Sequence, residues 1–456
     1  MADGLLDRVL AGAERYDMLP PPGGALLCAV SGGADSVCLL LMMCRAAREK
    51  GFSVFCAHYN HLLRGEESAR DADFVRELCR RLDVHCVVGS GDVRARAAET
   101  GKGIEETARE MRYAFLRETA DALGAARIAT AHNMNDNAET MLLNLARGAG
   151  SAGLAGIAPA RSGLVRPLLC LTRSEIERWL LEQGETWVTD SSNLLDEYAR
   201  NRLRHEALPA LESVNPAFVQ HALDAARRLR ADDAYLTELA ENFLREKAET
   251  LSGCTALPVE ALSRLPEPIF FRVLKKLGGQ AITEGHAQDV RGLLHEGGSG
   301  KCVSLPGMKV CRSFGKLCFG VPEALPPLPV RCLDAPGAIE IPECGIVIRR
   351  TDGVPGKINK SFKKFYFEMT KGCGRITIRP KIPGDRLRLP GRGCSKSLKA
   401  LFAEAEIPAW ERSRIPVLAD ENGLLAVVGF GADERRLAAP GEPAVLIEII
   451  EIKERD

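Results

Sequence analysis

The chain has 456 residues, acidic and basic side chains in equal number at 61 each, and 46% hydrophobic residues. These proportions are those of an ordinary globular protein, and the length predicts two to four domains. The longest apolar run, Val37 to Cys44, is too short to cross a bilayer, and the N-terminus lacks the apolar core of a signal peptide. We therefore expect no membrane partner, and any nucleic-acid binding has to come from local basic patches.

Strand-like and helix-like patterns alternate from residue 25 to about residue 190. The expected strands are 25–30, 52–58, 84–89 and 127–130. The expected helices are 36–50, 68–82, 104–123, 135–147 and 172–183. This alternation predicts an α/β fold with a parallel sheet and helices on both faces. In such sheets ligands bind at the carboxyl ends of the strands.

The rest of the chain has a different pattern. We expect a helical stretch over 217–247, a small mixed region over 251–320 and a proline-rich linker from Pro322 to Pro329. Short strands with glycine and proline turns follow, including 338–350 and 375–380, and one helix is expected over 396–406.

Fifteen cysteines are scattered along the chain, many of them inside apolar runs, and no C-x-x-C pair occurs. We expect most of them to be small buried hydrophobic residues in a reducing compartment, which predicts a cytoplasmic protein. A zinc or iron–sulfur site is the alternative that this spacing favours less.

The most informative segment is the turn after the first expected strand. Its residues are Ser31, Gly32, Gly33, Ala34, Asp35 and Ser36. Glycines let backbone N–H groups turn toward a ligand, and the N-terminus of the following helix attracts anions. The serine hydroxyls add donors, and a carboxylate beside phosphate indicates a bound metal ion. The pattern predicts a nucleotide pyrophosphate site, and an ordinary capped strand–turn–helix is the alternative.

Basic side chains accompany the next elements. His58 ends the second expected strand and Arg64 follows it, which favours contacts to nucleotide or tRNA over a solvated loop. Arg112 precedes an aromatic residue on the helix 104–123, and a fixed guanidinium binds phosphate at two points. Glu105 and Arg109 of that helix are interpreted as a salt-bridged exposed face.

The fourth strand runs into a helix start that carries three ionisable groups. His132, Asp136 and Glu139 are spaced i, i+4 and i+7, so we expect them to share one face. The carboxylates are candidates for holding an ammonium group or a metal ion, and His132 for contacting phosphate or moving a proton. Carboxylates at a helix N-terminus also occur for dipole reasons alone, which is the structural alternative.

Two further groups of basic residues favour phosphate contact. Arg200 and Arg204 of the RNRLR segment are predicted on one helical face. The region 375–414 holds more Lys and Arg than Asp and Glu, and Arg386, Lys396 and Lys399 are its candidate tRNA contacts. A solvated basic face is the alternative.

The SGGxDS turn after a strand resembles the PP-loop, or N-type ATP pyrophosphatase, superfamily. The series SGGxDS, HxNHxLR, ExxAREMRY, AHxxxDxxET, RGxG, RPLL, DSSN and RNRLR is similar, in this order, to the tRNA(Ile)-lysidine synthase family. The C-terminal segments IRP, PGDRL and SKSLK also resemble that family's tRNA-binding domain. The resemblance is strong over 25–216 and 375–437 and weak over 217–374.

This resemblance implies the domain organisation. It implies a Rossmann-like PP-loop ATP-pyrophosphatase catalytic domain at 1–216. A helical linker and small, mostly helical substrate-binding domain would occupy 217–321, and a linker with a basic α+β tRNA-binding domain 322–456.

The resemblance also implies the reaction and its substrates. ATP adenylates the C2 oxygen of the wobble cytidine in an isoleucine tRNA with a CAU anticodon, and pyrophosphate leaves. Lysine then displaces AMP and gives lysidine. The oligomeric state stays open, with a homodimer among the alternatives.

Residue roles follow from the matching motif positions. The catalytic residues would be Asp35, Arg112, His132 and Asp136. ATP would contact Ser31 to Ser36, His58 and Arg112, with Mg²⁺ on Asp35. Lysine would be held by Asp136 and Glu139. The tRNA would contact Arg64, Arg200, Arg204, Arg386, Lys396 and Lys399.

The chain departs from the family at two positions. The family usually reads HHxDDxxET, whereas this chain has Asn133 for the second His and Asn135 for the first Asp. Asparagine keeps hydrogen bonding and capping but loses charge and proton chemistry, so a metal or proton-transfer role at these positions is in doubt.

Two other functions are alternatives to the one that the resemblance implies. A tRNA cytidine 2-thiolation enzyme would call for C-x-x-C pairs, which are absent. A nucleotide-sensing or RNA-binding module would be expected to have a damaged PP-loop, and this loop is whole.

Overall fold

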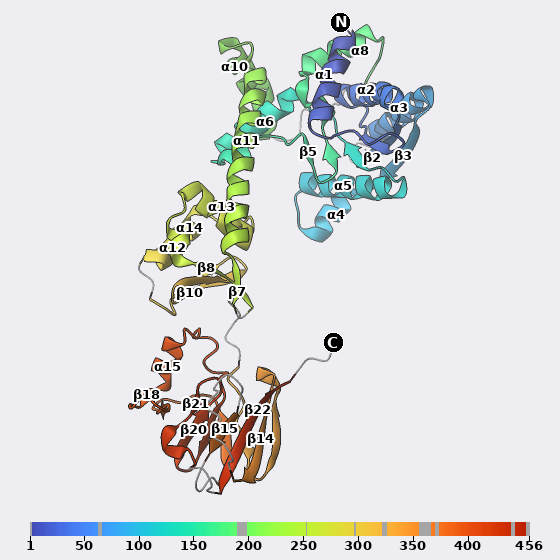
Figure 1. Ribbon diagram of the computed structural model, residues 1–456. Helices are drawn as coiled ribbons and strands as arrows, with labels where there is room; N and C mark the ends of the chain where they lie inside the picture. Colours follow the sequence, from blue (N-terminus) through green and yellow to red (C-terminus); the bar gives the residue numbers. More distant parts are fainter. Residues whose placement is uncertain are drawn as a thin grey trace. The chain divides into compact units, whose positions relative to one another are not determined.

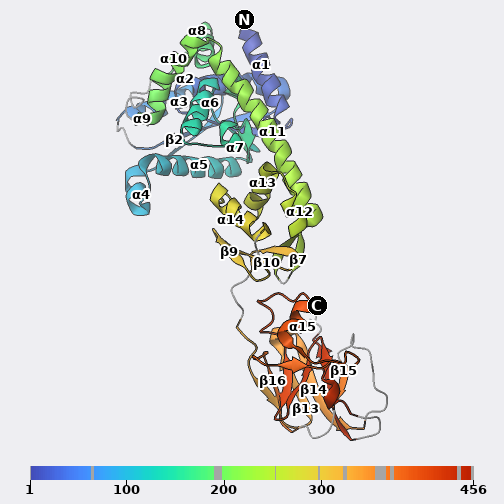
Figure 2. The same cartoon turned by 90° about the vertical axis from the view of Figure 1, so that its left-hand side faces the viewer.

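The computed structural model describes residues 2–62, 66–188, 198–251, 253–295, 298–321, 326–354, 366–369, 374–438 and 443–452. The chain divides into two compact units, residues 1–235 and 236–456 (Figures 1 and 2). Arg64 and the DSSN segment lie outside the described residues. No described helix is long and apolar enough to cross a membrane. The three-domain division at 216 and 321 stays a prediction.

The first unit is built on a six-stranded sheet with the order β3-β2-β1-β4-β6-β5. All neighbours are parallel except β5 and β6, which form an antiparallel edge. The strands are β1 (Ala25–Ala29), β2 (Ser53–Asn60), β3 (His85–Ser90), β4 (Arg127–Ala129), β5 (Ala160–Arg161) and β6 (Leu164–Val165).

Helices cover both faces of this sheet (Figure 1). They are α1 (Ala2–Arg15), α2 (Ala34–Lys50), α3 (Glu66–Leu82), α4 (Val93–Thr100), α5 (Ile104–Ala122), α6 (Met134–Ala146), α7 (Ser151–Leu154), η1 (Pro167–Cys170) and α8 (Arg173–Glu182). The chain then forms α9 (Tyr198–Arg202), the π-helical η3 (Leu203–Ala207), α10 (Leu208–Val214) and α11 (Phe218–Lys247), which continues past residue 235.

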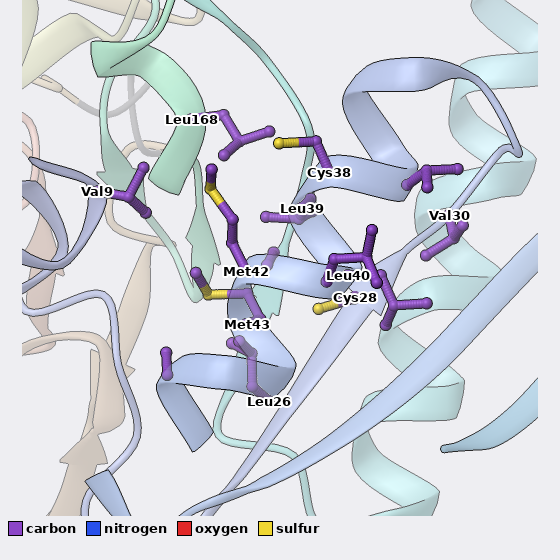
Figure 3. Close-up of a cluster of buried hydrophobic side chains, with 14 of the residues drawn as sticks. Val9, Leu26, Cys28, Val30, Cys38, Leu39, Leu40, Met42, Met43 and Leu168 are labelled. Carbon is purple, nitrogen blue, oxygen red and sulfur yellow. The ribbon is translucent and has the colours of Figure 1, made fainter. Parts of the chain in front are cut away.

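Alternation along the central strands creates two cores. Leu26 and Cys28 of β1 point to the face covered by α1, α2, α3 and α8, where the largest apolar cluster forms (Figure 3). Leu27 of β1 and Ala57 of β2 point to the opposite face and pack against α5. This alternation is the period-two geometry of a strand, and burial on both faces explains why β1 reads as a continuous apolar run.

The strand order reverses direction at β1. The connection from β1 leads outward to β2 and β3, whereas β4 lies on the other side of β1. The loops that leave β1 and β4 therefore open a crevice at the carboxyl edge of the sheet, the position at which doubly wound folds bind ligands. The expected PP-loop and the start of α6 meet at this crevice.

The second unit contains antiparallel sheets. Its first sheet, β7-β8-β11-β10-β9, packs around one core with three helices and the C-terminal part of α11. These elements are β7 (Glu249–Leu251), β8 (Cys254–Pro258), α12 (Val259–Ser263), α13 (Glu267–Gly278), α14 (Glu284–His295), β9 (Cys302–Leu305), β10 (Met308–Ser313) and β11 (Lys316–Phe319). The expected mostly helical domain thus also holds a sheet.

Two more sheets, β12-β16-β19-β20-β21 and β13-β14-β22-β15, share one apolar core in the C-terminal region. The strands are β12 (Arg331–Leu333), β13 (Gly337–Ile341), β14 (Ile346–Gly353), β15 (Tyr366–Met369), β16 (Ile376–Arg379), β19 (Val417–Asp420), β20 (Gly423–Val427), β21 (Gly431–Ala432) and β22 (Ala444–Glu451). The one described α-helix of this region, α15 (Leu398–Glu404), follows a small hairpin of β17 (Arg386–Leu387) and β18 (Lys396–Ser397). Two short 3₁₀ turns, η4 (Pro342–Cys344) and η5 (Glu434–Arg436), also belong to this region.

Helix α2 anchors the crevice because its first turn begins at the expected PP-loop and its body is buried. Leu39 is fully buried in the cluster of Figure 3. Leu39→Ala should lower the free energy of unfolding of the first unit by about 2–5 kcal/mol, from lost burial plus a cavity. Leu181→Ala on α8, where the side chain is 68% exposed, should change it by less than about 0.5 kcal/mol.

Urea unfolding followed by tryptophan fluorescence measures this difference, because Trp179 and Trp187 lie in the first unit. Equal stability of the two variants would contradict the burial of Leu39.

Candidate active site

The turn from β1 into α2 is organised by the Ser36 hydroxyl. Its oxygen accepts hydrogen bonds from the backbone N–H groups of Ser31 and Gly32, both at 3.1 Å, and donates to the carbonyl of Gly33 at 2.9 Å. Gly32 has a φ of +98°, a left-handed conformation that favours glycine. The first amides of α2, at Ala34 and Asp35, have no carbonyl to bind within the helix. These two amides stand at a helix N-terminus, where anions are favoured, and their binding of phosphate stays a prediction.

Asp35 lies beside the start of α6 and the start of α8. Its carboxylate accepts a hydrogen bond from Asn133 Nδ2 at 3.1 Å and forms an ion pair with Arg173. Burial raises the pKa of Asp35, the Arg173 guanidinium opposes this rise, and the nearby Asp136 charge adds to it. Asp35 is therefore a carboxylate whose ionised form depends on a cation beside it.

Asn133, at a position where the family usually has histidine, caps α6 and contacts Asp35. Its side-chain oxygen accepts the N–H of Asp136 at 3.0 Å while Asp136 accepts the N–H of Asn133, also at 3.0 Å. This reciprocal capping box starts α6 at Met134. The side-chain amide nitrogen of Asn133 also donates to Asp35, so Asn133 contacts both carboxylates, Asp35 through its side chain and Asp136 through its backbone N–H. Asn135 accepts the backbone N–H of Arg173 at 3.0 Å.

Asp136 and Glu139 share an arginine, as their spacing on one helix face allows. Arg204 donates to both oxygens of Glu139, at 2.7 and 3.0 Å, and lies 3.4 Å from Asp136 Oδ1. Arg200 lies 4.0 Å from the same Glu139. Glu139 is 1% exposed, so its charge depends on these partners. Burial has the largest effect on the pKa of Asp136 and raises it. The backbone hydrogen bond from Asn133 has the next largest effect and opposes this rise.

Arg200 and Arg204 lie on a helical segment that changes from α-helical to π-helical winding. Arg200 belongs to α9 and Arg204 to the π-helical η3, and insertions of this kind often occur at functional sites. The expectation that both arginines share a face is confirmed by their common partner, Glu139. Their predicted role as tRNA contacts stays a prediction.

His132 does not lie on the face of α6, which corrects the expectation from spacing. The helix begins at Met134 because Asn133 is the cap, so the helical period does not extend back to His132. Its Nδ1 lies 3.1 Å from the hydroxyl of Thr130. The pKa of His132 is lowered to about 3, first by burial and then by the charges of four nearby arginines: Arg166, Arg112, Arg109 and Arg200. His132 is therefore neutral and lies among basic side chains.

Basic side chains around His132 come from α5 and from the segment before η1. Arg109 and Arg112 stack over the ring of Tyr113 at 4.9 and 5.4 Å. Arg166 is buried and donates to the carbonyl of Ala158 at 2.6 Å. Burial lowers the pKa of Arg112 and of Arg166. Because burial also removes water from both guanidinium groups, they are suited to binding phosphate.

Other predicted site residues lie elsewhere. His58 is buried at the end of β2, its Nδ1 is 2.9 Å from the carbonyl of Val30, and burial lowers its pKa. In the second unit Arg386 donates to the carbonyl of Ser395 at 2.6 Å, Lys396 pairs with Glu404, and Lys399 is exposed.

Sequence reasoning missed three members of the site. Arg109 is exposed, as expected, and its charge nevertheless acts on His132. Arg166 was noted within a motif, and Arg173 was not singled out. Long-range pairing carries no local signal, although the RPLL motif marked the position of Arg166.

Comparison with known proteins decides the family. The PP-loop domain family matches residues 13–211, and the TilS substrate C-terminal domain family matches residues 376–449. A tRNA(Ile)-lysidine synthase of Geobacillus kaustophilus is 32% identical, with 92% of this chain and 93% of the relative covered. The chain belongs to the tRNA(Ile)-lysidine synthase family. A tRNA(Ile)-lysidine synthase of Dehalococcoides mccartyi is 34% identical over 90% of this chain and 92% of its own.

Membership of the tRNA(Ile)-lysidine synthase family confirms the resemblance read from the motif series, and with it an ATP-using PP-loop enzyme. It also confirms the fold class, a PP-loop α/β unit followed by a C-terminal region of antiparallel sheets. The rival readings, a thiolation enzyme and a non-enzymatic module, are not supported by these relatives.

The neutral state of His132 predicts a pH dependence. In the unfolded chain His132 titrates near pH 6.5, whereas in the folded chain its pKa is about 3. Between these values the unfolded chain binds more protons, so this stability is present above pH 6.5 and is lost as the pH falls. His132→Gln, which does not titrate, should flatten the acid side of the stability curve by up to about 1.4 kcal/mol per pH unit.

Urea unfolding of parent and variant between pH 4 and 7 measures the two slopes. Parallel curves would show that His132 keeps an ordinary pKa in the folded chain.

Proposed function

We propose that this chain ligates lysine to C2 of the wobble cytidine of an isoleucine tRNA with a CAU anticodon, converting ATP to AMP and pyrophosphate. The observation that carries the proposal is the crevice at β1 and β4. It brings together the PP-loop, the basic side chains around His132 and the carboxylates of Asp136 and Glu139, within a chain that belongs to the family along most of its length. Because its substrates are tRNA and ATP, we expect the enzyme to act in the cytoplasm.

The phosphates of ATP fit the start of α2. The amides of Ala34 and Asp35, the helix dipole and the nearby hydroxyls favour pyrophosphate. The C2 oxygen of cytidine, which attacks the α-phosphate of ATP as pyrophosphate leaves, is a weak nucleophile, so the chemistry depends on positioning and on charge neutralisation at that phosphate. Arg112 and Arg166, held against Tyr113 and Ala158, supply fixed positive charge for that purpose.

Mg²⁺ fits the carboxylates of this crevice. Magnesium is bound by one or two carboxylates together with substrate phosphates. Asp35 stands at the phosphate-binding turn, and the charge of Asp136 is close enough to raise its pKa. A bound Mg²⁺ would neutralise phosphate charge, and Asp35 is the residue proposed to hold it.

Lysine fits the place where Arg204 lies. Glu139 is buried and accepts two hydrogen bonds from one guanidinium, with Asp136 3.4 Å away from the same group. An ammonium group of lysine carries the same charge and three donors. We propose that Asp136 and Glu139 bind this ammonium group when Arg204 moves aside, leaving the other amine of lysine to attack C2.

ATP–pyrophosphate exchange tests the proposed reaction. The first step joins AMP to the tRNA and releases pyrophosphate before lysine reacts, so exchange should require tRNA but not lysine. Net AMP release should require ATP, tRNA and lysine together. AMP release without lysine, or exchange without tRNA, would contradict the proposed order.

Asp35→Ala should abolish this exchange, with a loss of at least about 100-fold and a folded chain. The reason is the loss of the carboxylate proposed to hold Mg²⁺. Asp73→Ala, an exposed carboxylate on α3, is the matched control and should keep parental activity. Near-normal exchange in Asp35→Ala would sink the assignment.

Glu139→Gln should raise the KM for lysine by about 10- to 100-fold and change the KM for ATP little, because a hydrogen-bonded charge contributes about 1.5–3 kcal/mol. Glu177→Gln serves as control, since Glu177 pairs with Arg173 on the exposed side of α8. Steady-state kinetics with each substrate varied separates the two constants. An equal rise in both, or a loss of thermal stability alone, would leave Glu139 a structural residue.

The C-terminal basic residues should contribute through salt-dependent contacts. Replacing Arg386, Lys396 and Lys399 by glutamine should weaken tRNA binding and reduce the slope of log Kd against log salt by roughly one charge for each lost contact. The lysine and ATP constants should stay unchanged.

The control for that experiment neutralises three exposed arginines that already pair within helices. They are Arg76, Arg80 and Arg96. Binding curves of the C-terminal variant that superimpose on those of the parent would rule out this surface as a tRNA contact.

A further inference from the structure

Three cysteine sulfurs converge away from the carboxylates of the crevice. Cys56 lies in β2, Cys79 in α3 and Cys86 in β3, and their Sγ atoms all lie within 4.8 Å of one another. Cys56 and Cys86 are direct neighbours in the parallel register of β2 and β3. Cys79 joins them because α3 packs on the same face of the sheet.

The cysteine triad is mostly buried, and this burial favours a bound ligand over simple packing of three thiols. Cys56 and Cys79 are buried, whereas Cys86 is only partly buried and leaves a route from solvent. Burial opposes ionisation, so a cation is needed to keep three thiolates here.

We propose that Cys56, Cys79 and Cys86 form a three-thiolate site for a thiophilic d¹⁰ cation, with monovalent copper as its occupant. Sulfur-only donors select soft ions over Mg²⁺. In the described part of the chain the group supplies three ligand atoms, which matches the trigonal coordination of Cu⁺. Structural Zn²⁺ takes four ligands, so zinc would need a further donor such as water.

Binding is an exchange of protons for the cation. Each S–H bond breaks, each sulfur keeps its electron pair and forms a bond to copper, and up to three protons go to solvent. Copper stays monovalent, so no oxidant or reductant takes part. The site would tie β2, β3 and α3 together and should raise the unfolding temperature of the first unit.

Competition with a chromophoric Cu⁺ chelator tests the site on the reduced full-length chain under anaerobic conditions. Cys86→Ser is the informative variant because this cysteine is partly buried and the substitution is small. Cys170→Ser, at a partly buried cysteine of the same unit, is the matched control. We expect the parent and Cys170→Ser to bind alike, and Cys86→Ser to lose at least tenfold in affinity for one equivalent.

Two further readouts keep the test decisive. Circular dichroism checks that Cys86→Ser folds, and ATP–pyrophosphate exchange without copper should be unchanged, because Cys86 has no role in the proposed reaction. X-ray absorption on the parent should show copper with a shell of three sulfurs. Equal copper affinity in all variants, an equal loss in both serine variants, or Cys86-dependent binding of Zn²⁺ without Cu⁺ would overturn the proposal.

Discussion

The crevice depends on charge balance among partly or fully buried carboxylates. Asp35, Asp136 and Glu139 gather where the first turns of α2 and α6 meet, and burial raises the pKa of the first two. Arginines from distant segments, Arg173 and Arg204, supply the opposite charge. A carboxylate left alone in such a place is costly, so some cation must always be present. In this structure Arg173 and Arg204 lie beside the carboxylates. In the proposed function Mg²⁺ and the ammonium group of lysine replace these arginines.

The topology explains why these charges meet at all. The strand order turns at β1, so the loops after β1 and β4 open side by side and two helix N-termini point at the same space. The proposed sites for phosphate, Mg²⁺ and the lysine ammonium group then need no special backbone beyond Gly32 and the cap at Asn133. The loss of the family's histidine is accommodated because an amide at Asn133 both caps α6 and holds Asp35.

Local signals in the sequence predicted the scaffold of the site. The apolar run before Ser31 and the glycines after it located β1, the turn and α2, and helical spacing paired Asp136 with Glu139. The two-residue strands β5 and β6 were missed because pairing so short leaves no periodic pattern. Arg173 and the surroundings of His132 were missed for another reason, since their partners lie far away along the chain. The proximity of Cys56, Cys79 and Cys86 likewise arises only from strand register and helix packing.

The most direct test of the account is analysis of the tRNA product. Isoleucine tRNA with a CAU anticodon is incubated with the full chain, ATP and isotope-labelled lysine, then digested and examined by mass spectrometry. The account predicts labelled lysine on the wobble cytidine, with AMP and pyrophosphate formed in equal amount. AMP and pyrophosphate formed while the cytidine stays unmodified, or label on another nucleotide, would contradict it.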